Sequence, residues 1–278
     1  MDLARQQALA ERFAALHRGS VPLLLPNAWD AGSAALFAAM EFDAIATTSG
    51  GVAWSLGYAD GEQLPLNELL DAVRRMVRVI DVPLTVDFEG GFGATPTAVS
   101  ESVRALLDTG AVGLNIDDGI AHAHLRDIGD AAARVAAARA AAESACVPAF
   151  INARVDCWIV GGAAPDALLD DAIRRARAYV DAGADGIYPI ALANPATIAA
   201  FCAAIPVPVN IGARKGLPDL AELGRLGVAR SAPPPAWRRW RCRRCAMPPP
   251  PCARAAVSTA LTRPSAMKAY KRCLNPIE

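Results

Sequence analysis

The feature that most constrains the fold is an alternation, repeated eight times between residues 20 and 230, of short apolar runs with longer amphipathic runs. The first seven short runs are nearly continuously apolar, as expected for parallel strands buried on both faces. The longer runs repeat apolar residues at helical spacing, and the pairs Thr95-Pro96 and Asn194-Pro195 are typical helix starts. The predicted strands are Val21–Leu25, Ala44–Thr48, Pro83–Asp87, Val112–Ile116, Pro148–Ala153, Gly186–Ile190, Val207–Ile211 and Gly227–Arg230.

Eight strand–helix repeats predict an α/β fold of the (β/α)8 type, a TIM barrel, for which about 250 residues is the usual size. A doubly wound open sheet is the alternative architecture. It lacks support here, because no G-x-G-x-x-G pattern follows the first predicted strand. In a TIM barrel, functional side chains are expected where the strands end.

Composition places the chain among globular proteins, because 53% of its 278 residues are hydrophobic and 20% are charged. No apolar run approaches the roughly 18 residues of a membrane span. The N-terminal segment reads as an amphipathic helix and lacks the apolar stretch of a secretory signal. We therefore expect a cytoplasmic protein with no membrane partner.

Charge and composition change abruptly near Arg230. Residues 1–230 carry 18 Lys and Arg against 27 Asp and Glu, whereas residues 231–278 carry 10 against 1. The second segment also holds 9 of the 21 prolines, and its proline runs oppose helix formation. We therefore predict a TIM-barrel catalytic domain over 1–230 and an atypical Pro/Arg/Cys-rich tail over 231–278, largely disordered, in place of the last helices.

Three interpretations of the tail are open. Its Arg and Trp residues suit nucleic acid or an acidic surface, although we expect no nucleic-acid partner. The favoured hypothesis is a shift of the coding frame near codon 230, which fails if neither other frame encodes an amphipathic helix pair. The third interpretation is part of a zinc site, formed by Cys242, Cys245, Cys252 and Cys273.

Polar side chains gather at the ends of the predicted strands, and in a barrel these ends form one mouth. Alternate residues of a strand point to the same side, so Asp87 and Glu89 can face one ion together, with Asp117 leaving the next strand. Carboxylate oxygens without nearby Cys favour Mg²⁺, with Mn²⁺ as the alternative, over Zn²⁺. The competing interpretation of these acids is a set of helix caps and loop carboxylates, which is favoured for Asp30.

A second group of strand-end residues suits an anion. Arg154 offers a guanidinium for bidentate capture of a carboxylate or phosphonate. The alternative is a structural salt bridge from Arg154 to Asp156 or Asp118. Ser49-Gly50-Gly51 offers a hydroxyl and unhindered backbone N–H groups, with a flexible turn as the alternative.

Taken in order, these stretches resemble the isocitrate lyase / phosphoenolpyruvate mutase superfamily, and most closely a phosphonomutase-like member. The matching stretches are PNAWD at 26–30, TTSGG at 47–51, Asp60 in GYADGEQLP, VDFEGGFG at 86–93, GLNIDDG at 113–119, INARVD at 151–156, GADGIYP at 183–189 and PVNI at 208–211. The resemblance implies a barrel, usually homo-oligomeric, that uses Mg²⁺ to cleave or form C–C or P–C bonds beside an oxo group. We expect the altered C-terminus to lack the helix that subunits of such oligomers exchange, which argues against the homo-oligomer that the resemblance implies.

The resemblance also implies roles for individual residues. Asp87 would be the direct metal ligand, while Asp60, Glu89 and Asp117 would hold metal-bound waters. Arg154, Ser49 and Asp60 would be catalytic. The substrate, a small 2-oxo acid or phosphonate, would be bound by Ser49, Gly50, Gly51, Arg154 and Asn210.

The sequence departs from the superfamily's lyases at three places. The loop after the fourth strand, Gly119–Asp127, contains no Cys, and Pro189-Ile190 stand where those lyases place an acid. Asp117 stands in place of a metal-site Glu. The Lys-Asn-Ser run of the mutase loop is absent as well. The chain is therefore interpreted as a phosphonomutase-like member that acts on a C–C or P–C bond through an enolate, and a 2-oxo-acid C–C lyase or an oxaloacetate-decarboxylase-like activity fits best. The alternative is a catalytically inactive oxo-acid-binding barrel.

Overall fold

A closed ring of parallel strands forms the centre of the computed structural model, which describes residues 2–120, 123–161, 168–214 and 216–232. β1 and β2 share one strand position: Leu23 pairs with Arg230 on one side, and Asn27 pairs with Ala46 on the other, so the ring closes. The predicted TIM barrel is therefore confirmed. The strands are β1 (Leu23–Leu24), β2 (Asn27–Ala28), β3 (Ile45–Thr47), β4 (Leu84–Asp87), β5 (Gly113–Asp117), β8 (Phe150–Val155), β9 (Gly186–Pro189), β10 (Val209–Gly212) and β11 (Val228–Ala232).

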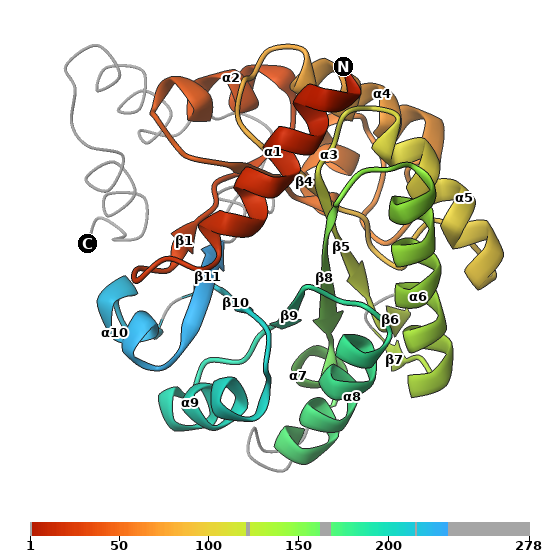
Figure 1. Ribbon diagram of the computed structural model, residues 1–278. Helices are drawn as coiled ribbons and strands as arrows, with labels where there is room; N and C mark the ends of the chain where they lie inside the picture. Colours follow the sequence, from red (N-terminus) through yellow and green to blue (C-terminus); the bar gives the residue numbers. More distant parts are fainter. Residues whose placement is uncertain (1, 121–122, 162–167, 215, 233–278) are drawn as a thin grey trace, which may run out of the picture.

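Helices surround this ring (Figure 1). They begin where the sequence indicated: the side chains of Thr95 and Asn194 accept hydrogen bonds from Ala98 N and Thr197 N, and Asp30 forms a capping box with Ser33. A small hairpin of β6 (Gly119–Ile120) and β7 (His124–Leu125) follows β5. The helices are α1 (Leu3–Leu16), α2 (Ala31–Ala39), α3 (Ser49–Ser55), α4 (Leu66–Val77), α5 (Pro96–Leu107), α6 (Ile128–Ser144), α7 (Cys157–Val160), α8 (Leu169–Asp181), α9 (Pro195–Ala204) and α10 (Leu220–Arg225).

One helix face differs from what its residues suggest. The sequence alone predicts that Arg174, Arg175 and Arg177 form a solvated surface of α8, and Arg174 and Arg177 are indeed exposed. Arg175 is instead buried and donates to Asp171 at 3.0 Å and to Asp118 at 3.3 Å. It lies three residues after Ala172, and helical residues three apart share a face, which here is the buried one.

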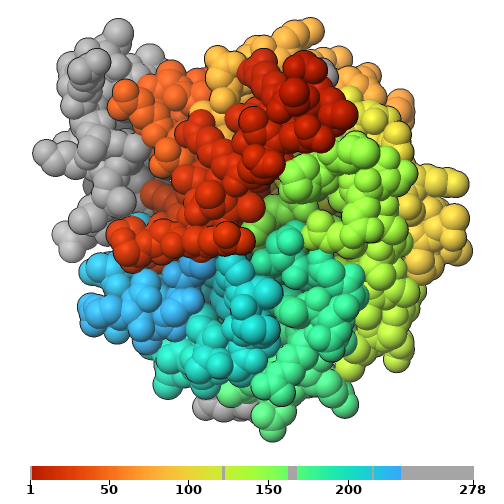
Figure 2. Space-filling view, in the orientation of Figure 1, coloured from red at the N-terminus to blue at the C-terminus, as the bar shows by residue number. Residues whose placement is uncertain are grey.

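Helix α1 closes the end of the barrel where the strands begin. The Phe13 ring meets Phe150 edge to face at 5.5 Å, and the His17 ring stacks on Phe150 at 4.0 Å. The amide of Gln6 donates to the carbonyls of Leu107 and Ala111, both at 2.8 Å, just before β5. Figure 2 shows α1 lying across this face of the molecule. The strands finish at the opposite end of the barrel.

The last strand sets the limit of the described barrel. β11 continues through Ala232, two residues beyond the predicted boundary at Arg230. The tail cysteines, prolines and arginines lie outside the described residues, so all three interpretations of the tail stay predictions. Within the described ranges, no helix is both long enough and apolar enough to cross a bilayer.

His17 generates a prediction about acid stability. Burial, and next the positive charge of Arg230, lower its pKa from 6.5 to about 3, so the folded state holds a neutral ring. A lowered pKa gives stability that is complete above pH 6.5 and is lost as the pH falls toward 3. Between pH 6.5 and 5 the loss should be about 2 kcal/mol.

Urea unfolding at pH 7.5 and pH 5 measures this loss in the wild type and in His17→Phe, which keeps an aromatic ring but does not titrate. The free energy of unfolding should fall by about 2 kcal/mol more in the wild type than in the variant. Equal losses in both proteins would show that His17 is not the group responsible.

Candidate active site

The predicted site residues meet at the end of the barrel where the strands finish. Asp87 is the last residue of β4 and Asp117 the last of β5. Asp117 pairs in register with Arg154 of β8. Because the strands are parallel, all three side chains reach the same rim. Sequence reasoning therefore placed the acids and Arg154 at the correct end of the fold.

Asp87 is held by its two neighbouring strands, β3 and β5, and by the first residue of α3. Its Oδ2 accepts from the backbone N–H of Ser49 at 3.1 Å, and its Oδ1 accepts from the amide of Asn115 at 3.4 Å. Its own N–H donates to the hydroxyl of Thr47 at 2.9 Å. Asp87 stays half-buried rather than fully enclosed, so its carboxylate is fixed in direction and accessible from the mouth.

Glu89 joins the loops after β3 and β4. Its Oε2 accepts from the backbone N–H of Glu62 at 2.6 Å. Burial, and next the negative charges of Asp87 and Asp60, raise its pKa to about 8. Asp60 packs against the backbone of Gly50, where an added Cβ would lie 2.9 Å from its Oδ2. The four predicted acids, Asp117 included, thus form one cluster of mutually repelling charges.

Asp117 and Arg154 form a buried ion pair with Asp156 as its third member. Nη2 of Arg154 lies 2.6 Å from Oδ2 of Asp117, and its Nε lies 2.7 Å from Oδ1 of Asp156. Burial raises the pKa of Asp117 although Arg154 opposes that rise. Burial alone would lower the pKa of Arg154, but the two carboxylates raise it above its ordinary value. Of the two salt-bridge partners considered from the sequence, Asp156 is the direct one.

Behind this pair, a second layer of polar residues fixes Asp156. Its backbone N–H donates to Oδ1 of Asp118 at 2.8 Å. Oδ2 of Asp118 accepts from the hydroxyl of Tyr179 at 2.6 Å and from Arg175 at 3.3 Å. Sequence reasoning missed this layer, although the spacing of Arg175 and Tyr179, four residues apart in α8, was a usable signal.

The donor set fits a hard divalent cation. Asp117 is buried, and its Oδ1 has no hydrogen-bond partner among the described residues. The described ranges contain no preformed group of three His, Cys, Asp or Glu ligands. Mg²⁺ usually keeps several waters and takes one or two protein carboxylates, so one direct ligand with water-mediated acids suits this arrangement.

The two remaining predicted contacts differ in how they are placed. Ser49-Gly50-Gly51 forms the first turn of α3 rather than a flexible turn, and the N–H of Ser49 already donates to Asp87. Gly50 and Gly51 are buried in that turn. Asn210 lies within β10, 1% exposed, and neither atom of its amide has a partner in the described structure. It is therefore available to a bound molecule or to water.

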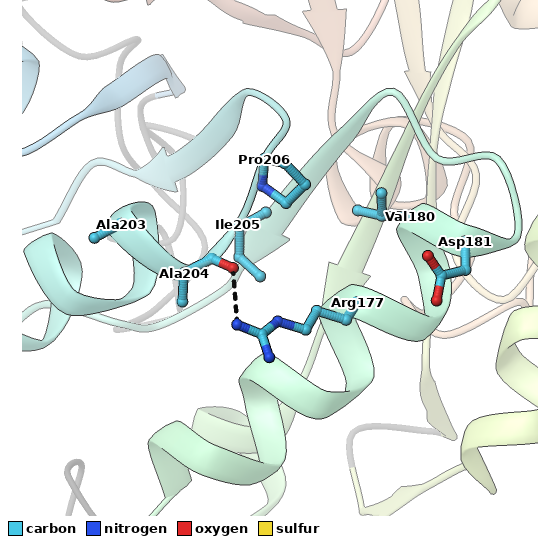
Figure 3. Close-up of a pocket in the computed structure, with 7 residues that line it drawn as sticks. All are labelled: Arg177, Val180, Asp181, Ala203, Ala204, Ile205 and Pro206. Carbon is cyan, nitrogen blue, oxygen red and sulfur yellow. Dashed lines mark hydrogen bonds between the residues drawn. The ribbon is translucent and has the colours of Figure 1, made fainter.

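The surface pockets lie beside or away from this cluster. One, of about 410 Å³, lies between α8 and α9, where Arg177 donates to the carbonyl of Ala204 at 3.4 Å (Figure 3). These helix ends precede β9 and β10, so the pocket faces the closed end of the barrel. A second, of about 520 Å³, borders the loop of Glu62 and is lined by Arg126 and Arg134. Neither contains Asp87 or Arg154.

A family model described as phosphoenolpyruvate phosphomutase matches residues 13–239. The chain belongs to this family. It is thereby a member of the isocitrate lyase / phosphoenolpyruvate mutase superfamily, as the strand-end motifs indicated.

Relatives and solved structures agree with this placement. An uncharacterised protein of Mycobacterium tuberculosis is 38% identical over 77% of this chain and 78% of its own length. The 2-methylisocitrate lyase of Escherichia coli is 35% identical over 68% of this chain and 64% of its own. The crystal structure of a candidate phosphonomutase of Burkholderia cenocepacia aligns with a TM-score of 0.80 at 42% identity, covering 84% of this chain and 94% of that one. Members of the superfamily act as lyases and mutases on small 2-oxo acids.

The buried ion pair generates a prediction about stability. Replacing Arg154 with Ala leaves Asp117 and Asp156 buried without their cation, which should lower the free energy of unfolding by about 3–5 kcal/mol. Arg174→Ala is the matched control, because the Arg174 side chain is 70% exposed. Denaturant unfolding at pH 7.5 measures both. A loss for Arg154→Ala no larger than that for Arg174→Ala would contradict the account of the pair.

Proposed function

We propose that this protein is a Mg²⁺-dependent enzyme that cleaves a carbon–carbon bond next to the oxo group of a small 2-oxo acid. The observation that carries the proposal is the convergence of Asp60, Asp87, Glu89 and Asp117 beside Arg154 at one barrel mouth. A concentration of negative charge at this point is costly unless a cation balances it. A buried arginine beside it suits the carboxylate of an acid substrate.

Asp87 would hold the ion, and Asp60, Glu89 and Asp117 would orient its waters. When bound, Mg²⁺ supplies Lewis-acid stabilisation of negative charge on the oxygens of the substrate. The protein contributes a fixed direction for the Asp87 carboxylate, which Ser49 and Asn115 hold from two sides. Preorganised groups of this kind do not need to reorient during the reaction, which is the usual source of electrostatic catalysis.

Arg154 would bind the substrate's carboxylate through the guanidinium edge that now contacts Asp117. Asp156 would keep the guanidinium in place, since it accepts from both Nε and Nη2. The N-terminal turn of α3 presents the backbone of Gly50 and Gly51 on the neighbouring side, and the first N–H groups of a helix lack intrahelical acceptors. These groups would exclude water and fix the orientation of the oxo acid.

The relatives include both chemistries: the family model and one solved structure are named for phosphonate chemistry, whereas two further relatives are named as a lyase and a decarboxylase. We propose carbon–carbon cleavage on the basis of these last two. Besides the 2-methylisocitrate lyase, an oxaloacetate decarboxylase of Bradyrhizobium is 34% identical over 63% of this chain and 59% of its own length. Because the loop after β5 carries no Cys, a simple β-oxo diacid such as oxaloacetate is the substrate class that we propose. The conversion of oxaloacetate to pyruvate needs only the loss of carbon dioxide and the addition of one proton.

Calorimetric titration with oxalate, which mimics the planar enolate, tests the site. The wild type should bind oxalate with Mg²⁺ present and lose at least tenfold in affinity when the metal is removed by a chelator. Asp87→Asn should show the same loss with Mg²⁺ present, because the amide removes the negative charge that attracts the ion. Asp108→Asn is the control, because its side chain is 65% exposed and lies on the outer surface.

Pyruvate release from oxaloacetate then separates an enzyme from the alternative, an inactive oxo-acid-binding barrel. Release that depends on Mg²⁺ and on Asp87 supports the proposed activity. Oxalate binding without any turnover of oxaloacetate or related 2-oxo acids would favour the inactive barrel. No Mg²⁺-dependent oxalate binding at all would contradict both.

A further inference from the structure

Tyr188 places a phenol hydroxyl inside the barrel. None of the site residues predicted from the sequence offers such a group. Tyr188 lies on β9 in register with Arg154 of β8. Residues paired across parallel strands project to the same side of a sheet, so Tyr188 enters the interior that Arg154 faces. The side chain is half-buried, like that of Asp87, so part of it remains accessible.

Gly212 of β10 leaves the space that this hydroxyl occupies. A Cβ added to Gly212 would lie 2.5 Å from Oη of Tyr188, a distance that no side chain permits. Gly212 does not adopt the left-handed backbone conformation that would otherwise explain a glycine. A tyrosine on β9 thus lies next to a glycine on β10, which has no side chain to fill the same space.

Among the described residues, the Tyr188 hydroxyl forms no hydrogen bond. The amide of Asn210 on β10 is also unpartnered there. Burial raises the pKa of Tyr188 to about 12, with Arg154 opposing the rise and Asp87 adding to it. The phenol is thus a protonated donor at neutral pH that is directed into the space beside the charged cluster.

The position of Tyr188 relative to the acids determines which part of a bound oxo acid its hydroxyl can reach. The acids and Arg154 belong to β4, β5 and β8, while Tyr188 and Gly212 belong to β9 and β10, further round the ring. In the binding mode proposed above, the oxygens of the oxo acid face Asp87 and Arg154, and its third carbon would extend toward β9 and β10. Neither Pro189 nor Ile190 has a side-chain proton to donate there.

We propose that Tyr188 is the catalytic acid that protonates the enolate carbon after the carbon–carbon bond breaks. This inference rests on the proposed function. The bond breaks with its electron pair remaining on the oxo-acid fragment as the enolate, and carbon dioxide leaves in the case of oxaloacetate. The enolate carbon takes the proton from Oη and becomes the methyl group of pyruvate. The resulting phenolate takes a proton from water, so one proton is consumed in each turnover.

Exchange of the methyl protons of pyruvate with D2O, followed by NMR, tests this step in reverse and does not depend on which group is cleaved. With Mg²⁺ present, the wild type should exchange above the protein-free rate. Tyr188→Phe removes only the hydroxyl and should reduce the enzyme-catalysed exchange by at least about a hundredfold, the lower range for a general acid or base. Its oxalate affinity and melting temperature should stay at wild-type values.

Two further variants sharpen the comparison. Gly212→Ala should also slow the exchange, because its Cβ displaces the hydroxyl while Tyr188 itself is unchanged. Tyr58→Phe is the matched control and should exchange at the wild-type rate, since the Tyr58 hydroxyl donates to Glu68 on α4.

The outcomes separate the two proposals. If the wild type binds oxalate with Mg²⁺ and Tyr188→Phe exchanges as fast as the wild type, Tyr188 is not the acid and the proposed function stands. If the wild type binds oxalate but catalyses no exchange, the inference is overturned in the same way. If the wild type does not bind oxalate with Mg²⁺, the proposed function fails and the role of Tyr188 fails with it.

Discussion

The functional end of this barrel depends on one interaction, the buried contact of Arg154 with Asp117 and Asp156. Arg154 is 4% exposed and Asp156 is fully enclosed, so the three charges are almost completely removed from water. Each is tolerable there only because the others compensate for it. The arrangement also fixes where strands β5 and β8 end, since Asp117 and Arg154 are paired in register. Charge balance and strand register therefore support each other at the site.

The cluster is not neutral, and this imbalance points to its function. Arg154 faces Asp117 and Asp156, while Asp87 and Glu89 lie beside it and form no ion pair within the described ranges. The raised pKa values of Glu89 and Asp117 express the cost of holding these carboxylates together. Strongly shifted groups of this kind gather at functional sites. A divalent cation would relieve the repulsion, which is why we connect the cluster with metal-assisted chemistry.

Much of the architecture was predictable because parallel barrel strands have a simple signature. Nearly continuous apolar runs located the first seven strand positions, and helix-start pairs such as Thr95-Pro96 indicated where helices begin. Asp87 and Arg154 were assigned to one rim because the ends of parallel strands must meet. The same signature hid Tyr188, because a strand that is apolar on both faces does not reveal which residues point into the barrel.

Residues outside the strands were harder to assign. Arg175 was predicted to be a surface residue because of its charge. Its spacing of four residues from Tyr179, which places both on one helix face, was the better guide. Asp118 follows Asp117 directly, yet it faces α8 and not the mouth, where it accepts from Tyr179. Neighbouring residues at a strand end thus have different roles, one facing the site and the other holding the helix behind it. Only the packed structure separates them.

The most direct test of the central claim is a crystal structure of the protein grown with Mg²⁺ and oxalate. The account predicts an ion whose direct protein ligand is Asp87, with oxalate between that ion and Arg154 and with the Tyr188 hydroxyl facing the bound molecule. Oxalate bound only on the outer surface, or an ion held without Asp87, would contradict it.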